Sequence, residues 1–387
     1  MTEIKIIKHT TPKHLAETYC KISDFIDEPI VLLIPSDLAQ YRFGLLADIL
    51  KLIITINSNC DIKIVKLDFA LSELDKFYEQ EYSYPIVSLL WNTAEFVDKD
   101  GKNIKSFLRE KQNEFFIKMN SFEKFKGNKH IWVNTDHLSK SKGLIRLLEN
   151  SNGFNDDEEK IANTVKKILI KNILTFKKQN LIEVEDILED IGAIVYELTK
   201  NTFEWGRTDS NSVEIPSSVR GAYLRFHINK KEKIIEEYKG TPIATFFNHQ
   251  RIEREYLNHL KRVYYLEIVV FDSGVGFIDK FHQQDEIDDL SIIKKCLIKN
   301  QTSSTSNLKS KKGIGLDRIL RILDKKGFLK ISTDKYNVYR DLIKDNYVTV
   351  KNNNLKDLVI EDWNQDGFEN QIKAQGSFIS ILYPFKN

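Results

Sequence analysis

The chain of 387 residues has few cysteines, and none of them forms a pair typical of a zinc site or a disulfide framework. Its three cysteines, Cys20, Cys60 and Cys296, are far apart in the sequence, and no CxxC motif occurs. An odd number of separated cysteines favours reduced thiols over a disulfide-stabilised secreted domain. We therefore expect a cytoplasmic protein.

Long hydrophobic runs and an excess of one charge are also missing. The most apolar stretch, residues 49–56, is interrupted by Lys51 and is far shorter than the roughly 20 residues that a membrane helix needs. The N-terminus lacks the apolar segment and cleavage site of a signal peptide. The 58 basic and 56 acidic residues leave a net charge of +2. Neither a membrane nor a nucleic acid is indicated as a partner.

The residues that are present describe a globular chain, with 41% hydrophobic and 29% charged residues and a length that favours two or three domains. In residues 1–150, strands alternate with helices, which predicts an α/β regulatory or partner-binding domain. PIVLLIP (29–35), DIKIVKLDF (61–69) and KGNKHIWVN (126–134) favour strands, FGLLADILKLIITI (43–56) favours a helix, and YPIVSLL (84–90) fits either a strand or a helix start.

A second unit is expected over residues 151–387, after the polar stretch SNGFNDDEE (151–159). Helices are predicted over 159–176 and 184–205, and strands over 221–229, 264–272, 327–333 and 376–385. The charge-dense segment 230–262 is typical of an insertion or a solvated helix.

The stretch VVFDSGVGF (269–277) ends a hydrophobic strand with an aspartate and two glycines. The carboxylate of Asp272 can accept a hydrogen bond from an exocyclic amine, and Gly274 and Gly276 permit close approach to the backbone. A tight turn that uses Asp and Gly is the competing interpretation.

Upstream, the run ELTKN places Glu197 and Asn201 four residues apart, on one face of the predicted helix. The amide oxygen of Asn201 is a hard ligand suited to magnesium. Glu197 can orient or deprotonate a nucleophile. Solvated surface positions are the alternative interpretation of both residues.

Downstream, SKKGIGLDRIL (310–320) places Gly313 and Gly315 just before a predicted helix. Backbone N–H groups at a helix N-terminus favour phosphate, and Lys311 and Lys312 add positive charge. A single GxG before a helix is weak evidence when it stands alone.

Taken in order, the ELxxN helix, the DxGxG strand end, the GxGL helix start and the terminal GSF strand resemble the GHKL superfamily of ATP-binding domains, which includes the gyrase, heat-shock chaperone, histidine kinase and mismatch-repair types. The resemblance runs from about residue 180 to the C-terminus. It implies an α/β sandwich of the Bergerat type, with a mixed sheet on one side and helices on the other, that binds ATP and Mg²⁺. Members of this superfamily often dimerise, so a homodimer is one expectation.

The resemblance implies a role for each matching residue. Glu197 would be the catalytic base, Asn201 the magnesium ligand, and Asp272 the acceptor of the adenine amino group. Ser377 would help to hold adenine through water. The adenine pocket and the phosphate contacts would come from Gly274, Gly276, Lys312, Gly313, Gly315 and Leu316.

The chain also departs from the family pattern. The second glycine box is often GxGxG, and its first position here is Lys311. Glu197 and Asp272 are 75 residues apart, a long interval that the charged segment 230–262 explains. Residues 277–312 correspond to the ATP lid, although a plain surface loop is an equal alternative for the hydroxyl-rich part, 301–312.

The N-terminal strand–helix–strand pattern resembles a STAS-type regulatory domain, and a generic α/β sensor or partner-binding module is the alternative. A self-phosphorylating histidine kinase is disfavoured, because no histidine falls within residues 151–196. We expect an ATPase or serine-kinase-like switch whose lid closure signals to a protein partner. The alternatives are a non-catalytic ATP or ADP sensor and a motor-type ATPase whose transducer comes from another chain.

Overall fold

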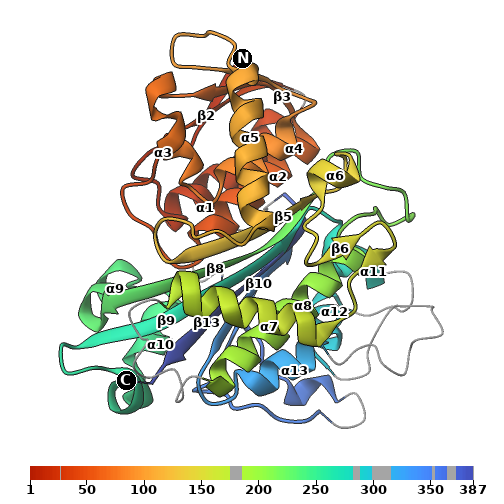
Figure 1. The fold of residues 1–387 in the computed structure, drawn as a ribbon. Helices are drawn as coiled ribbons and strands as arrows, with labels where there is room; N and C mark the ends of the chain where they lie inside the picture. The colour runs from red at the N-terminus through yellow and green to blue at the C-terminus, as the bar shows by residue number, and fades with distance from the viewer. Residues whose placement is uncertain are drawn as a thin grey trace.

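The N-terminal part of the chain is built on a parallel sheet covered by helices (Figure 1). The computed structural model describes residues 1–26, 28–174, 185–281, 288–298, 315–350, 354–363 and 372–386. All three strand pairings in this first sheet are parallel. Its strands, in spatial order, are β1 (Thr2–Lys5), β2 (Pro29–Ile34), β3 (Asp61–Leu67) and β4 (Glu95–Val97).

One helix of this unit, α2 (Leu45–Asn59), is apolar on nearly all sides and is buried along most of its length. A helix with this composition needs neighbours around it. It packs on helices of its own unit and also on the second sheet, against β13 and β9. The other helices of this region are α1 (Pro12–Cys20), α3 (Leu74–Tyr78), α4 (Ser83–Leu90), α5 (Lys105–Asn120) and α6 (Lys140–Gly143).

The second sheet has seven strands, and every described pairing in it is antiparallel. We expected a mixed sheet here, so this feature differs from the prediction. The strands, in spatial order, are β12 (Glu361–Asp362), β11 (Tyr336–Asp341), β10 (Phe328–Asp334), β13 (Ala374–Phe385), β9 (Arg262–Asp272), β8 (Val219–Lys230) and β5 (Lys129–Thr135).

The seven-stranded sheet is covered on both faces. Helices α7 (Glu158–Ile168), α8 (Glu185–Trp205) and α13 (Gly315–Ile322) lie on one face (Figure 1). Helix α2 covers the other face, where the backbone N–H of Gly44 donates to Glu267 at 2.7 Å and the N–H of Gln375 donates to Thr55 at 3.2 Å. The chain is therefore a mixed α/β protein in which one sheet lies between two helical layers.

The charged segment between β8 and β9 is helical. It contains α9 (Lys231–Glu237), α10 (Pro242–Asn248) and a π-helical turn (Ile252–Tyr256). The apolar residues among its charges, including Phe246 and Phe247, form a small core of their own with Phe43 and Phe328. The segment is thus an insertion with one packed side, and most of its charged residues face solvent.

A buried arginine fixes the edge of the second sheet. The guanidinium of Arg220, on β8, donates to Glu149 at 2.7 Å and to Asp136 at 2.9 Å, and its side chain is almost fully enclosed. Asp136 and Glu149, like strand β5, precede the expected domain boundary at residue 150. A domain boundary at residue 150 stays a prediction. Strand β5, which precedes this residue, belongs to the second sheet.

Most of the predicted elements are confirmed, including the strands β2, β3, β5, β8, β9, β10 and β13 and the helices α2, α7 and α8. The ambiguous stretch 84–90 is helical, in α4. Six described strands were not predicted: β1, β4, β11, β12 and the two-residue strands β6 (Glu149–Asn150) and β7 (Gly153–Phe154), which pair with each other.

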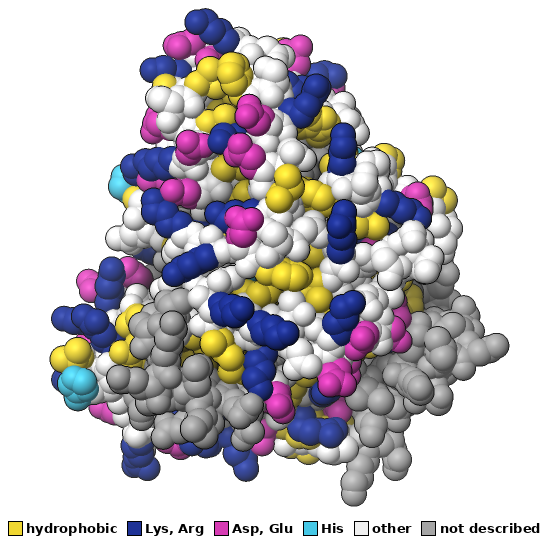
Figure 2. Space-filling model, in the orientation of Figure 1, with side chains coloured by type: hydrophobic (Ala, Val, Ile, Leu, Met, Phe, Trp, Pro, Cys, Tyr) yellow, Lys and Arg dark blue, Asp and Glu magenta, His cyan; other side chains and the backbone are white. Residues whose placement is uncertain are grey.

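The surface carries both signs of charge. On the face shown in Figure 2, acidic and basic side chains are interspersed, which agrees with the small net charge of the chain. Among the described residues, no helix is both long and apolar enough to cross a bilayer.

The Arg220 ion pairs lead to a stability prediction. Replacing Arg220→Leu leaves the buried Glu149 carboxylate without its cation, so we expect the free energy of unfolding to fall by about 3–5 kcal/mol. Urea denaturation followed by circular dichroism measures the change. Arg146→Leu, at an exposed position, is the matched control and should shift the midpoint little. Equal stabilities for the two variants would contradict the prediction.

Candidate functional site

Asp272 is the last residue of β9, in the middle of the second sheet. In the sheet register it lies between Arg220 of β8 and Ser377 of β13. Its buried carboxylate accepts the backbone N–H of Gly274 at 2.9 Å and a second backbone hydrogen bond from Ser377. The local sequence explains this arrangement, because a short turn after the strand returns the Gly274 N–H to the preceding carboxylate.

The Asp272 carboxylate has no basic side chain in contact with it among the residues that the structure describes. Burial raises its pKa to about 6, while the backbone hydrogen bonds and the nearby charge of Arg220 act in the opposite direction. The N–H groups of Arg220 are directed to Asp136 and Glu149 instead. A buried acid with a raised pKa and spare acceptor capacity is a candidate for a ligand site.

The C-terminal end of α8 packs directly against this carboxylate. A Cβ added to Gly206, the residue after the helix, would lie 2.5 Å from the Cβ of Asp272. A Cβ added to Gly274 would lie 2.9 Å from the Cα of Gly206. The space left by the missing side chain of Gly274 is thus filled by the backbone of Gly206. This contact packs the end of α8 against the end of β9.

Two further glycines shape the turn and have left-handed backbones. Gly276 has φ +84°, and a side chain there would meet the Thr333 hydroxyl at 2.6 Å. Gly376 has φ +94°, and a Cβ there would meet the backbone oxygen of Asp272 at 2.1 Å. Glycine is required at both positions for its conformation and for space.

Glu197 and Asn201 lie one turn apart on α8, as expected. The Glu197 carboxylate accepts from Arg318 of α13 at 3.2 Å, and Arg318 also donates to Glu158 at 2.7 Å. Burial raises the pKa of Glu197, and Arg318 opposes the shift. The half-buried Asn201 amide makes no hydrogen bond within the described part of the chain.

The structure places the predicted residues in two groups along α8. Gly274, Gly276 and Ser377 surround Asp272 at the C-terminal end of the helix. Glu197 lies about 12 Å further back, given the rise of 1.5 Å per residue, and a Cβ on Gly315 would lie 2.8 Å from its Oε2. Leu316 is buried in the core beside α8.

Most of the predicted lid, with Lys312 and Gly313, lies outside the described residues. Helices α11 (Gly276–Phe281) and α12 (Asp289–Cys296) occupy most of the described part of that segment.

Sequence analysis missed four residues of this region: Gly206, Arg318, Gln375 and Gly376. The Gln375 amide donates to the backbone oxygens of Ser273 at 3.0 Å and Gly274 at 2.6 Å, which fastens the turn to β13. The GSF motif contains Gly376 and could have indicated it. Arg318 is a basic residue three positions after Gly315, which could have indicated a contact near the predicted phosphate loop. No local signal distinguishes Gly206 from an ordinary helix-terminal glycine.

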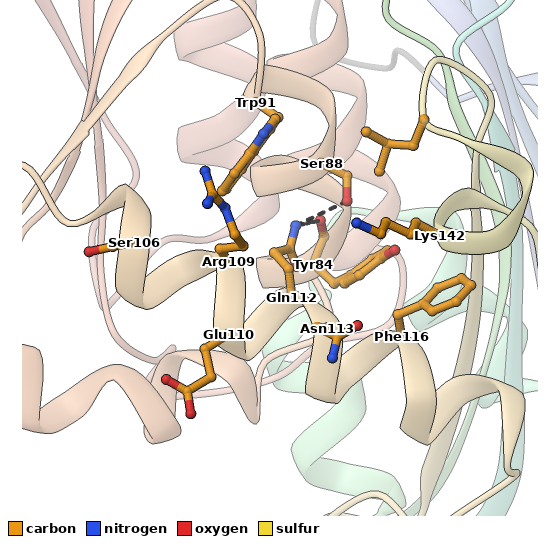
Figure 3. Close-up of a pocket in the computed structure, with 11 residues that line it drawn as sticks. Tyr84, Ser88, Trp91, Ser106, Arg109, Glu110, Gln112, Asn113, Phe116 and Lys142 are labelled. Atoms are coloured by element: carbon orange, nitrogen blue, oxygen red, sulfur yellow. Dashed lines mark hydrogen bonds between the residues drawn. The ribbon is translucent and has the colours of Figure 1, made fainter.

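A separate cavity of about 610 Å³ lies in the N-terminal unit, between α4, α5 and α6 (Figure 3). The side chain of Gln112, on α5, reaches α4 and donates to Ser88 Oγ at 3.0 Å. Trp91, Arg109 and Lys142 also line the cavity. None of the predicted site residues contributes to this cavity.

Comparisons of the chain with models of protein families, with characterised proteins and with solved structures find no match. Within the described residues, no group of three or more His, Cys, Asp or Glu side chains is arranged to hold a metal ion.

The burial of Asp272 leads to a pH prediction. Its folded pKa of about 6 lies above the ordinary value of 3.8, so proton uptake stabilises the fold, and the free energy of unfolding falls as pH rises from about 4 to 6. Asp272→Asn removes this ionisation, so we expect the fall in the free energy of unfolding between about pH 4 and 6 to be lost in the variant. Denaturation across pH 4–8 measures the difference. Asp24→Asn, at an exposed position, should leave the profile unchanged, and a wild-type profile that is flat across this range would refute the assignment.

Proposed function

We propose that the chain is a magnesium-dependent, adenine-nucleotide-binding regulatory protein whose residues 151–387, together with strand β5, form a GHKL-type ATP-binding domain. One observation carries the proposal. A buried carboxylate without a cation partner among the described residues, Asp272, lies at the end of the helix that also presents Glu197 and Asn201. The order of the three motifs along the chain supports the same interpretation.

Asp272 has the chemistry needed to recognise the adenine ring. Its carboxylate already accepts two backbone N–H groups, and a carboxylate has further lone pairs to offer. An exocyclic amine would donate to it and favour the charged form. Ser377, paired with Asp272 in the register, adds a hydroxyl beside the same strand end.

Asn201 would hold Mg²⁺ through its amide oxygen. Mg²⁺ commonly keeps water and phosphate ligands and uses only one or two protein oxygens. A single amide at the edge of α8 is therefore sufficient, and a dedicated cluster of carboxylates is not needed.

Glu197 is suited to act on a hydroxyl or a water molecule. Its raised pKa brings it nearer to neutral pH than an exposed glutamate, which improves a general base. Bound ATP would supply the transferable phosphoryl group, with Mg²⁺ offsetting its charge. Glu197 would then orient and deprotonate either water, in an ATPase, or a serine hydroxyl of a protein partner, in a kinase-like switch.

A non-catalytic sensor is the second candidate, and the contact between Arg318 and Glu197 favours it. Arg318 engages the carboxylate that catalysis would require to be free. In this form the chain would bind ATP or ADP and signal to its partner through the position of the lid alone. A motor-type ATPase with a transducer from another chain remains the third possibility.

The adenine contact is tested by nucleotide binding. We expect Asp272→Asn to weaken ADP binding at pH 7.5 by at least about tenfold, because a charge-assisted hydrogen bond is lost. Isothermal titration calorimetry measures the affinity, and Asp24→Asn serves as the control. A thermal melt of the variant at the same pH distinguishes a loss of affinity from a loss of folded protein. Unchanged affinity would remove Asp272 from the site.

The catalytic role is tested by turnover of γ-labelled ATP, alone and with candidate protein partners. If the chain is an enzyme, we expect Glu197→Gln to lower turnover by roughly 10²–10⁴-fold while ADP binding persists. Glu236→Gln, on the exposed side of α9, is the control. Label released as free phosphate indicates an ATPase, and label on a partner indicates a kinase. Tight binding with negligible turnover in both wild type and variant would favour the sensor.

A further inference from the structure

A second cavity, of about 540 Å³, lies between the N-terminal unit and the seven-stranded sheet. Helices α1 and α2 form one wall, residues 237–241 of the insertion form another, and β10 and β11 form the floor. A volume of this size is typical of a small-molecule site. None of the residues predicted for nucleotide binding lines it.

The cavity and the candidate nucleotide site are on opposite faces of the same sheet. Side chains alternate between the faces of a strand. On β10, Thr333 lies against Gly276 on the α8 face, whereas Lys330 bonds Asp48 of α2 on the other face. A ligand in this cavity would therefore occupy a site of its own.

The lining of the cavity includes two lysines and one carboxylate, Lys330 from the β10 floor and Lys51 and Asp48 from the α2 wall. The buried Lys330 ammonium is 3.1 Å from Asp48 Oδ1. The Lys51 ammonium donates to the amide oxygen of Asn337 at 3.1 Å. No carboxylate is in contact with Lys51 among the described residues. Lys51 is therefore a cation whose hydrogen-bond partner is neutral.

The environment of Lys51 is short of negative charge. Burial lowers the pKa of Lys51 to about 8, and Lys330 acts in the same direction, while Asp48 opposes them. Basic residues also outnumber acidic ones along the whole lining. The basic residues are Lys13, Arg42, Lys51, Lys239 and Lys330, and the acidic ones are Asp48 and Glu237.

Aromatic side chains complete the walls. Tyr19, Phe43, Tyr238 and Trp363 line the cavity. The ammonium of Lys51 is 4.7 Å from the centre of the Tyr19 ring, and that of Lys330 is 4.7 Å from the Trp363 ring. These rings place apolar surface next to the two cations, so the cavity suits a ligand with both an acidic group and a flat apolar part.

We propose that this cavity binds a small organic anion that carries a phosphate or carboxylate group joined to a ring, with the acidic group held by Lys51 and Lys330. Arg42 and Lys239 at the lining add attraction for the same charge. The proposal does not depend on nucleotide binding, because it uses a different face of the sheet and different residues.

The test uses two ring-bearing probes, phenyl phosphate and benzoate, titrated into the full chain at millimolar concentration and followed by calorimetry. We expect at least one of them to bind. Binding of phenyl phosphate alone identifies a phosphate site, and binding of benzoate alone identifies a carboxylate site. Absence of binding by both probes would overturn the proposal.

Variants then locate the bound probe. Lys51→Met keeps an unbranched side chain one atom shorter than lysine and removes its charge, so we expect affinity to fall by at least about tenfold. Arg42→Gln, at a half-exposed position whose guanidinium bonds only the side chain of Gln40 among the described residues, should weaken binding without altering the melting temperature. Lys63→Met, at an exposed position, and Asp272→Asn should bind the probe as wild type does. Affinity that is unaffected by both the Lys51 and the Arg42 changes would place the probe elsewhere and refute the proposal.

Discussion

The burial of the seven-stranded sheet on both faces determines where the polar chemistry of this protein lies. Helix α8 covers one face and α2 covers the other, and β9 and β13 are buried along almost their whole length. Strands in this position read as continuous apolar runs, without the alternation of a half-exposed strand. Any charged group on these strands is therefore enclosed and needs a partner or a function.

Two acidic residues of β9 illustrate the difference. Glu267 faces α2, accepts the N–H of Gly44 at 2.7 Å and lies 2.9 Å from His227 Nε2, so its burial has a structural explanation. Asp272 faces α8 and accepts backbone N–H groups only, among the described residues. Burial therefore raises the pKa of Asp272 to about 6, because two backbone hydrogen bonds only partly offset the loss of water around the charge.

Much of the fold could be predicted from the sequence, because the strongly apolar segments of β2, β9 and α2 have clear lengths and turn signals around them. Packing between segments that are distant in the sequence could not be predicted. The placement of α2 on β13 and the pairing of β5 with β8 depend on contacts between residues far apart in the chain, which no local period encodes. The same limit applies to the candidate site: the motifs predict roles for Glu197 and Asp272, but the contact between Arg318 and Glu197 and the contact of Gly206 with Asp272 arise only in the folded chain.

The position of β5 has a consequence for how the protein can be divided. A fragment that began at residue 151 would lose the outermost strand of the sheet and expose the unpaired edge of β8, which invites pairing with other chains. It would also separate Arg220 from both of its acidic partners. A C-terminal fragment that keeps the whole seven-stranded sheet must therefore start upstream of Lys129. Residues 129–150 precede the predicted boundary but belong structurally to the second sheet, so they are not a simple linker.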